Sequence, residues 1–416
     1  MNTRSRHTIV MATSSYPRFQ GDGVGSFIEP IAHGIAALGH EVHIVAPWHP
    51  LIRRPIEENG VHFHFFRYFP SKNLNIFGYA SSLTADVALR PATYLITPFA
   101  LVSWWNKVRQ VAKRHHASLI HAHWVIPGGF VSAATHLPIP MIVSLHGSDV
   151  FVAESYALAR MAAGYTFSNA AWVTACSDDL RQRAITIGAD AQRSETIPYG
   201  VDADRFKPNA LTRAKMRQLH NINDQTPLIV AAGRLVRKKG FEFLIDALGT
   251  LKTRYPQVRL WLVGGGDLEN ELRQRTKSKG LNAHVKFFGA LPQHELASIL
   301  CTADITVVPS VRDDAGNVDG LPNILLEALS SGSTVVATPA GGITTVAKDG
   351  ETACIVPERD PNKLSETIEK LLTNVDLRTE LGSAARTLML HNYTWQHVAK
   401  RFEKAYQNTI THHADT

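Results

Sequence analysis

The chain has 416 residues, enough for two domains of roughly 150–200 residues that each bury their own core. Apolar residues make up 44% and charged residues 19%, which is typical of a soluble globular protein and excludes a disordered or fibrous chain. The formal net charge is +7, and a basic balance of this kind favours acidic substrates, nucleic acid or an anionic membrane as partners.

The basic excess is densest between Trp48 and His116, where nine Lys and Arg residues stand against three acids. Two interpretations stay open: a solvated basic face, or a surface that meets an anionic membrane or an acidic substrate. We expect no nucleic acid partner, because no nucleic-acid-binding motif accompanies the charge.

Cysteine usage and the apolar runs predict a cytoplasmic protein. Cys176, Cys301 and Cys354 lie far apart without CxxC spacing, which disfavours a zinc or redox motif and suits a reducing compartment. The apolar core of the N-terminal stretch is too short for a signal peptide. Neither Pro91–Asn106 nor His115–Ser148 reads as a transmembrane helix, because the first is short and prolines interrupt both. Peripheral attachment to the inner membrane face stays open.

Short β-branched runs alternate with helical patterns along the first half, which is typical of parallel βαβ units. We expect one helix at Phe27–Leu38, ended by Gly39, and another capped by Ser177. The expected strands are Thr8–Ser14, Glu41–Ala46, Val61–Arg67, Leu119–His123, Met141–Leu145 and Ala171–Ala175.

The segment Ile197–Pro208 has turn residues and no apolar period, so it is predicted to connect two domains. A second βαβ series follows, and two doubly wound sheets would place a ligand cleft outside the carboxyl ends of their strands. The expected strands are Leu228–Ala232, Arg259–Val263, Val285–Phe288, Ile305–Pro309, Thr334–Thr338 and Cys354–Val356. The expected helices are Phe241–Arg254, Leu268–Ser278, His294–Thr302, Asn323–Ser331 and Thr394–Gln407.

The loop GRLVRKKG, residues 233–240, follows a predicted strand and therefore lies at the carboxyl end of a sheet. Four of its eight residues are cations, and the glycines at both ends let the backbone approach a ligand. The planar fork of Arg and the point charge of Lys both suit phosphate oxygens. A solvated basic loop is the alternative interpretation.

The stretch DGLPNILLEA also begins beyond a predicted strand. Pro322 suits the first position of a helix, whose free N–H groups would bind phosphate. Asn323 and Glu327 are four residues apart and share a helix face, where sugar hydroxyls could satisfy the carboxylate. Alternatively, Glu327 pairs with Arg234 or Lys239 as a structural ion pair.

Together, GRLVRKKG and DGLPNILLEA, about 80 residues apart, resemble the paired motifs of the retaining glycosyltransferases of family 4, which have the GT-B fold. The resemblance covers nearly the whole chain and includes GDGVGSF, HGSDVF, YGVDADRFKP, VGGGD, FFGAL and the tail helix after YTW. It implies two Rossmann-like doubly wound α/β domains facing across a cleft. The implied parts are an N-terminal acceptor-side domain (1–197), a linker (198–208), a C-terminal nucleotide-sugar-binding domain (209–392) and a C-terminal helix (393–416) that packs back on the N-terminal domain.

The resemblance implies a donor site in the C-terminal domain. Arg234 and Lys239 would hold the diphosphate of a nucleotide sugar, Asp319 would contact the sugar hydroxyls, and Glu327 would hold the ribose hydroxyls. Further donor contacts would come from the backbone of the residues after Asp319 and from a loop beside the base, namely Gly320, Leu321, Pro322, Asn323, Gly289 and Ala290.

In the N-terminal domain the resemblance implies that His146 lies against the donor sugar, while Gly23 and Gly25 line the donor phosphate and the acceptor. The family most often has Glu where this chain has Asp319. The shorter side chain should place its carboxylate about 1.5 Å closer to the backbone. We expect its role to be kept, and the choice of donor to depend on it.

The implied reaction transfers a hexose or related sugar from a nucleotide diphosphate sugar to a glycan, lipid-linked or small-molecule acceptor, in envelope or exopolysaccharide assembly. Anomeric configuration would be retained by front-face attack, with no metal and no further cofactor. Alternatives that keep the fold are a nucleotide-sugar epimerase, a phosphorylase and a non-catalytic nucleotide-sugar-binding partner. A NAD-dependent oxidoreductase lacks the expected GxGxxG fingerprint.

Two further patterns leave alternatives open. His121 and His123 share a face of a predicted strand, but a metal site there would need further ligands that the sequence does not identify. Trp104 and Trp105 precede a basic helical segment, which is either an interfacial membrane anchor or an amphipathic surface helix.

Overall fold

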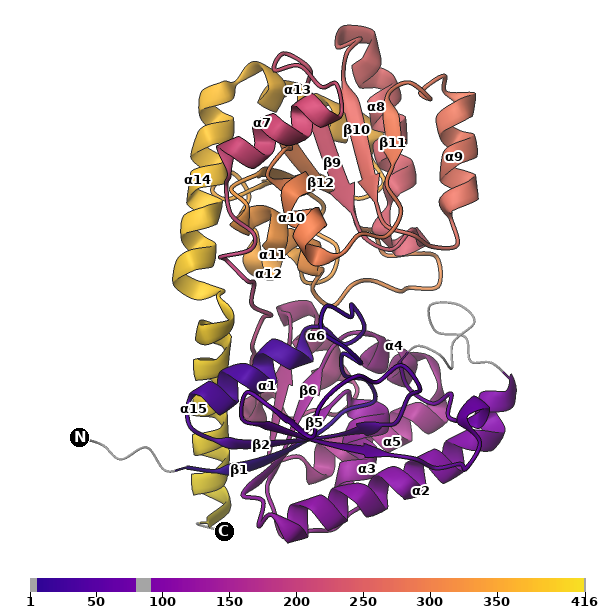
Figure 1. The fold of residues 1–416 in the computed structure, drawn as a ribbon, viewed down its shortest axis with the longest axis vertical. Helices are drawn as coiled ribbons and strands as arrows, with labels where there is room; N and C mark the ends of the chain where they lie inside the picture. The colour runs from indigo at the N-terminus through magenta and orange to yellow at the C-terminus, as the bar shows by residue number, and fades with distance from the viewer. Residues whose placement is uncertain (1–5, 80–90, 415–416) are drawn as a thin grey trace, which may run out of the picture. The chain divides into compact units, whose positions relative to one another are not determined.

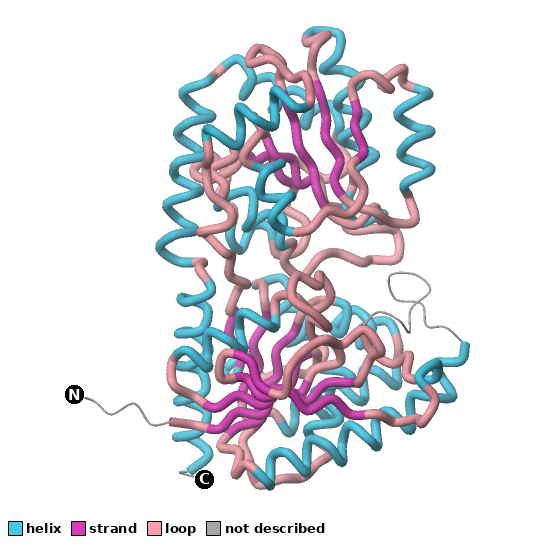
Figure 2. Tube along the Cα trace, viewed as in Figure 1, coloured by secondary structure: helices cyan, strands magenta, loops and turns pink. Residues whose placement is uncertain are grey.

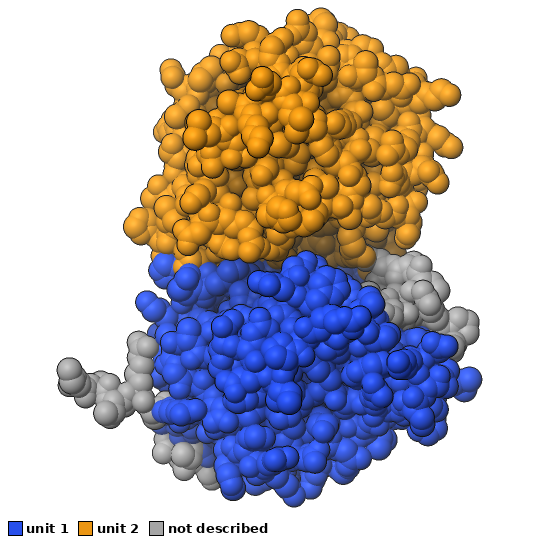
Figure 3. Space-filling view, viewed as in Figure 1, with its two compact units in different colours: residues 1–199, 395–416 blue, residues 200–394 orange. Residues whose placement is uncertain are grey.

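The computed structural model describes residues 6–79 and 91–414, which fall into two compact units (Figure 1). The first unit comprises residues 1–199 together with 395–416, and the second comprises residues 200–394 (Figure 3). Each unit is built around one sheet of mostly parallel strands with helices packed on it (Figure 2). The predicted fold class, two Rossmann-like α/β domains, is confirmed.

The first unit's described strands form a sheet in the order β3-β4-β2-β1-β5-β6-β7-β8, parallel except for the β3–β4 pair. All the strands predicted for this half are confirmed, with ends displaced by two residues or fewer. Their buried β-branched runs suit a sheet that is covered on both faces. The strands are β1 (Thr8–Ala12), β2 (Glu41–Pro47), β3 (Glu57–Glu58), β4 (Val61–Phe66), β5 (Leu119–His123), β6 (Met141–Leu145), β7 (Trp172–Ala175) and β8 (Ser194–Thr196).

The helices of the first unit are α1 (Ile28–Ala37), α2 (Pro91–Arg114), α3 (Phe130–Ala133), α4 (Ser148–Ser155), α5 (Ala157–Asn169), α6 (Asp178–Thr186) and α15 (Trp395–Ala414). The predicted cap of α6 is confirmed, because the Ser177 side chain accepts a hydrogen bond from the Leu180 N–H group. Short helical turns lie at Lys72–Leu74, Val125–Gly129 and Ala191–Arg193.

Helix α2 corrects the interpretation of the two tryptophans as an interfacial anchor. The Trp104 side chain is fully buried, and the Trp105 indole N–H donates to the Ala134 carbonyl oxygen at 2.9 Å. A fully buried ring such as that of Trp104 belongs to the core, and the half-buried Trp105 ring is held to the protein by its hydrogen bond, so neither ring is placed to anchor in a membrane interface. The helix also begins at Pro91 and contains Pro98, so it is longer than the basic segment alone.

The C-terminal helix α15 completes the core of the first unit. Its Val398, Phe402 and Tyr406 side chains pack in one apolar cluster with residues of α1, β1 and β2. At Gly34 of α1, a Cβ atom would lie only 2.7 Å from the Ala399 Cβ atom, so a glycine there allows the two helices to approach closely. The predicted tail helix is confirmed and extends to Ala414.

The second unit's described strands form a parallel sheet in the order β11-β10-β9-β12-β13-β14. All the predicted strands are confirmed, with ends displaced by one residue or none, whereas α7, α12, α13 and α14 were not predicted. The strands are β9 (Leu228–Ala232), β10 (Arg259–Val263), β11 (Val285–Phe287), β12 (Ile305–Val308), β13 (Thr334–Ala337) and β14 (Cys354–Ile355). The helices are α7 (Ala210–Leu219), α8 (Phe241–Arg254), α9 (Glu269–Ser278), α10 (Gln293–Leu300), α11 (Asn323–Ser330), α12 (Ile343–Val346), α13 (Pro361–Thr373) and α14 (Val375–Asn392), with a short turn at Arg237–Lys239.

Both sheets contain a point where the strand order reverses. In the first unit β1 lies between β2 and β5, and in the second β9 lies between β10 and β12. The loops that leave neighbouring strands at such a point run in opposite directions, which opens a crevice at the carboxyl ends of the strands. The loops after β9 and β12 therefore form the expected ligand-binding edge of the second unit.

Candidate active site

The loop after β9 is held against the end of β12 by a glycine. Gly240 has a left-handed backbone with φ of 64°, and a Cβ atom there would lie 2.0 Å from the Pro309 carbonyl oxygen. Only glycine combines that conformation with that approach. The basic side chains of this loop are thereby placed beside the segment that follows β12.

Two lysines of this loop meet the carboxylate of Asp319, whose side chain is 14% exposed. The Lys239 Nζ atom lies 2.5 Å from one carboxylate oxygen of Asp319, and the Lys238 Nζ atom lies 3.5 Å from the other. Burial by itself would raise the pKa of Asp319, but Lys239, Lys238 and Arg234 outweigh it and hold that pKa below its usual value. Asp319 is therefore ionised, and it neutralises part of the positive loop.

The backbone at Asp319 is also closely packed. A Cβ atom on Gly341, in the loop after β13, would lie 2.1 Å from the Asp319 carbonyl oxygen, and Gly341 has φ of 58°. The loop after β13 thus supports the segment that carries the carboxylate. Sequence reasoning did not identify Gly341, although a glycine pair after a strand is a signal for close backbone approach.

Helix α11 begins at Asn323, and Pro322 occupies the N-cap with an extended backbone rather than the predicted first helical position. The Asn323 side-chain oxygen is buried and has no hydrogen-bond partner within the described part of the chain. An unmatched buried polar atom at a helix N-terminus is costly unless a ligand meets it. Gly320, Leu321 and Pro322 form the approach to this N-terminus, with Leu321 and Pro322 buried.

Glu327 lies one turn further along α11 and is 9% exposed. Burial raises its pKa to about 7, and the nearby charges of Lys239 and Arg205 offset this only partly. Among the described residues its carboxyl group has no hydrogen bond and no ion pair, so the alternative of a structural pair with Arg234 or Lys239 is wrong. The carboxyl group is available to hydroxyl donors from a ligand.

The loops after β9, β10 and β11 pack directly on one another. The Gly264 N–H donates to the Gly289 carbonyl oxygen at 2.8 Å, and a Cβ atom on Gly264 would lie 1.8 Å from the Gly233 carbonyl oxygen. Space is open at Gly289, where a Cβ atom would meet nothing within 4 Å, and Ala290 is exposed. A flat group could therefore lie beside Gly289 without displacing a side chain.

In the first unit His146 follows β6 and has both ring nitrogens engaged. Its Nε2 atom lies 3.0 Å from the His123 Nδ1 atom, and its Nδ1 atom lies 2.8 Å from the Tyr199 hydroxyl oxygen. Burial and the neighbouring His123 hold the pKa of His146 well below its usual value. A neutral ring fixed at both nitrogens is suited to orienting a ligand rather than to accepting a proton. Sequence reasoning did not identify Tyr199.

Gly23 and Gly25 lie in the loop between β1 and α1. The carboxylate of Asp22 anchors this loop, accepting from the Arg18 guanidinium at 2.6 and 3.0 Å. Gly25 has φ of 67° and a Cβ atom on it would lie 3.1 Å from the Ser15 carbonyl oxygen, whereas Gly23 faces open space. Gly25 therefore shapes the loop, and Gly23 leaves room beside it.

His121 and His123 do not form the metal site that was left open. The His121 nitrogens contact the Tyr406 hydroxyl and the Ser144 hydroxyl, each at 2.7 Å, and His123 contacts His146. Both rings thus belong to a buried hydrogen-bond network that ties α15 to the sheet.

Two family models match the chain in succession. "Glycosyl transferase 4-like domain" matches residues 22–200, and "Glycosyl transferases group 1" matches residues 212–388. The two matches cover most of both units, and the second contains Arg234, Lys239, Asp319 and Glu327.

The chain is 33% identical over 257 residues to the GDP-mannose-dependent alpha-(1-6)-phosphatidylinositol monomannoside mannosyltransferase of Mycolicibacterium smegmatis, covering 62% of this chain and 67% of that enzyme. Other relatives at least 30% identical match over 51–60% of their own length. An uncharacterized glycosyltransferase of Methanocaldococcus jannaschii is 23% identical over 96% of this chain and 97% of its own. Sucrose-phosphate synthase from Thermosynechococcus elongatus has the same fold, with a TM-score of 0.79 at 20% identity over 98% of this chain and 100% of that chain.

Replacing Glu327 with Gln should change how stability depends on pH. Burial raises the pKa of Glu327 from 4.5 to about 7, so between these values the folded chain keeps a proton that the unfolded chain loses. The free energy of unfolding of the wild type should therefore fall, relative to that of Glu327→Gln, by up to about 3 kcal/mol as pH rises across this window. Urea denaturation at several pH values measures the difference.

The exposed Glu351 supplies the matched control. Glu351→Gln should follow the wild type at every pH. If the Glu327→Gln and wild-type curves stay parallel, the carboxyl group of Glu327 is ionised throughout and the account of its burial is wrong.

Proposed function

The chain belongs to the glycosyltransferases of family 4, which have the GT-B fold, and on that basis we propose that it transfers a hexose from a nucleoside diphosphate sugar to a hydroxyl group of a glycan or lipid-linked glycan. The observation that carries the proposal is the grouping of Lys239, Asp319 and Glu327 at the strand-order reversal of the second unit. A buried carboxyl group and a second one that is largely shielded from water, beside a lysine pair and a helix N-terminus, suit a ligand that has both hydroxyl groups and phosphate.

The donor's diphosphate is assigned to Arg234, Lys239 and the first N–H groups of α11. Cations and a helix N-terminus both stabilise phosphate charge. Bound phosphate would compete with Asp319 for Lys239, and the sugar hydroxyls would then satisfy the released carboxylate. Glu327 is assigned to the ribose hydroxyls, because its carboxyl group has no hydrogen-bond partner among the described residues.

The base is assigned to the open space beside Gly289 and Ala290, and the backbone from Gly320 to Asn323 to the sugar and phosphate. The M. smegmatis relative is named as GDP-mannose-dependent, so GDP-mannose is the first donor to test. Asp319 is the residue we expect to discriminate between sugars.

Calorimetric titration with nucleoside diphosphates and their sugars, GDP-mannose first, tests the donor site. Arg234→Ala and Lys239→Ala should each weaken binding by about 10–100-fold, since each removes a charge-assisted hydrogen bond of about 1.5–3 kcal/mol. Arg237→Ala is the matched control, because Arg237 lies in the same loop but is ion-paired with Glu271 on the exposed side. It should bind donor as the wild type does.

The titration is run in EDTA, since the proposed stabilisation of the diphosphate needs no metal. If none of the nucleotides binds, or if Arg234→Ala and Lys239→Ala bind as tightly as Arg237→Ala, the assignment of the donor site is wrong. Binding that requires Mg²⁺ would contradict metal independence.

The proposed reaction retains anomeric configuration by attack on the face that the diphosphate leaves. The bond from the anomeric carbon to the diphosphate breaks, a bond to the acceptor oxygen forms, and the departing phosphate oxygen takes the acceptor's proton. Arg234, Lys239 and the α11 N-terminus stabilise the leaving charge. His146 orients the sugar as a neutral ring, and Gly23 and Gly25 keep space for the donor phosphate and the acceptor.

Product stereochemistry tests this mechanism. With GDP-mannose, or whichever nucleotide sugar the titration identifies, and an alkyl glycoside acceptor, the one-bond carbon–proton coupling at the anomeric carbon of the product should report the donor's configuration. An inverted product contradicts front-face attack. Donor consumption without acceptor, yielding an epimeric nucleotide sugar, would instead identify an epimerase.

We further propose that the chain acts at the anionic cytoplasmic face of a membrane. None of the helices among residues 6–79 and 91–414 is long and apolar enough to cross a bilayer. Helix α2 nevertheless exposes the side chains of Leu95, Phe99 and Val102, which are 78%, 56% and 59% exposed. Their spacing places them on one face of the helix, and Lys113 lies on the same face near the end of the helix. Apolar residues in line with a cation are typical of a surface that rests on anionic lipid. Asp86 and Arg90 of the predicted basic region lie outside the described residues.

Cosedimentation with vesicles that contain anionic lipid tests the membrane surface. Leu95→Glu combined with Phe99→Glu should lower the bound fraction about tenfold or more, because two large apolar side chains no longer enter the lipid. Leu211→Glu combined with Leu219→Glu is the matched control, since these leucines, 85% and 65% exposed, lie on α7 of the other unit. Equal loss in both variants, or no binding by the wild type, contradicts the proposal.

A further inference from the structure

Two neighbouring strands of the first unit gather histidines on one face. In the parallel register His43 of β2 lies opposite His62 of β4, and Val45 lies opposite His64. Because side chains alternate along a strand, His43, His62 and His64 project from the same face of the sheet. The opposite face carries Val42 and Ile44, which pack in the apolar core with α1 and α15.

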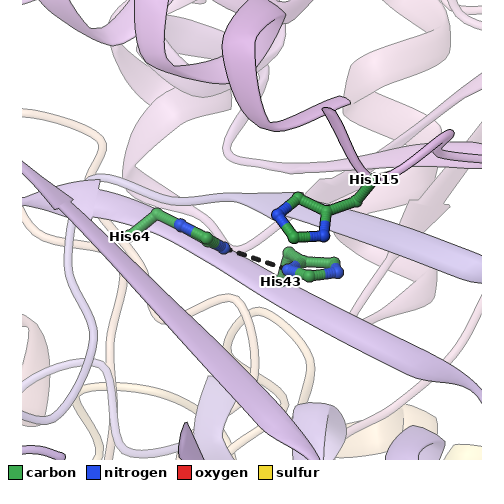
Figure 4. Close-up of side chains that lie close together, drawn as sticks. All are labelled: His43, His64 and His115. Atoms are coloured by element: carbon green, nitrogen blue, oxygen red, sulfur yellow. Dashed lines mark hydrogen bonds between the residues drawn. The ribbon is translucent and has the colours of Figure 1, made fainter. Parts of the chain in front are cut away.

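A fourth histidine ring, that of His115, approaches from the segment after α2. The centroid of the His115 ring lies 4.0 Å from that of His43 and 5.5 Å from that of His64. The His43 Nδ1 atom lies 3.0 Å from the His64 Nε2 atom, and one nitrogen from each of the three rings lies within 4.8 Å of the others (Figure 4). Three residues far apart in sequence thus converge on one point.

The surroundings favour the form of histidine that binds metal. The His43 ring is fully buried and the His64 ring is half-buried, and a neutral imidazole keeps one nitrogen with a free electron pair. The Glu41 carboxylate lies 3.0 Å from the Nε2 atom of His43, on the side away from His64. A carboxylate on the outer nitrogen orients the ring and strengthens the inner nitrogen as a ligand.

We propose that His43, His64 and His115 bind a divalent transition-metal ion, with Zn²⁺ as the best match. Imidazole nitrogens suit Zn²⁺, and three of them with one position open to water make a tetrahedral set. Nitrogens bound to such an ion at about 2.0–2.1 Å are about 3.4 Å apart. The His43–His64 separation is already close to that value, and the His115 nitrogen, which lies within 4.8 Å of the other two, would have to come at most about 1.4 Å closer.

The position of this triad distinguishes the ion's site from the one that contains His146. Glu41 and Val61 begin their strands, and His115 precedes β5, so the triad lies toward the amino ends of the strands. His146 follows β6 and therefore lies at the carboxyl ends of the strands, opposite the triad in the same sheet. A bound ion would join β2, β4 and the end of α2. The competing explanation is a cluster of neutral histidines held by the His43–His64 hydrogen bond without any ion.

Titration of the tag-free, EDTA-treated full chain with Zn²⁺ and with Co²⁺ tests the proposal. Wild type should bind one ion per chain by calorimetry, and Co²⁺ should give the visible absorption of a tetrahedral site. His115→Asn should weaken binding by at least about tenfold, because one of the ligands is lost. His116→Asn is the matched control: the same substitution at the adjacent, exposed residue, whose φ of 49° suits Asn.

Zn²⁺ should also raise the unfolding temperature of the wild type and of His116→Asn but not of His115→Asn. If His115→Asn fails to fold, His64→Gln replaces it as the test variant. Absence of saturable binding by the wild type, or equal affinity in His115→Asn and His116→Asn, overturns the proposal in favour of a metal-free cluster. Donor binding in EDTA is a separate measurement on the second unit, so failure of one proposal does not imply failure of the other.

Discussion

The ion pair between Lys239 and Asp319 is the interaction on which the second unit's candidate site depends. It joins the loop after β9 to the segment after β12, across the point where the strand order reverses. Both groups are largely shielded from water, so loss of Asp319 would leave Lys239 without its carboxylate partner, whereas loss of Lys239 would leave Asp319 paired with Lys238 alone. Gly240 and Gly341 permit the close backbone packing that brings the two segments together. Glu327 differs from Asp319 because no residue that the structure describes pairs with its carboxyl group, and burial therefore raises its pKa to about 7.

The sequence predicted the strands well and some helices poorly, for identifiable reasons. Buried parallel strands appear in a sequence as short runs of β-branched residues, and each such run in this chain can be recognised by itself. The first part of helix α2 was missed because a proline normally ends a helix. Pro98 is instead exposed, and Ala100, Trp104 and Val108 anchor the helix along one face. Helix α13 did carry a signal, since Asp360 caps it and Pro361 follows at the first position.

The site was predictable where its residues are close in sequence or belong to paired motifs. The spacing of Asn323 and Glu327 determines that they share a helix face, and the structure agrees. Contacts between distant segments were not predictable, because they depend on strand register and loop packing. The His146–Tyr199 hydrogen bond joins two such segments, and so does the approach of His115 to His43.

Helix α15 has a consequence for how the chain is made. The first unit is interrupted by the whole of the second, and its apolar core lacks Val398, Phe402 and Tyr406 until the final helix is present. During synthesis the second unit is complete before the first, although the first begins at the N-terminus. The sheet of the first unit must therefore wait, with one apolar face covered only in part, by α1, while residues 200–394 are translated. Chain termination shortly before α15 would leave a folded second unit attached to an unfinished partner, exposing hydrophobic surface to aggregation.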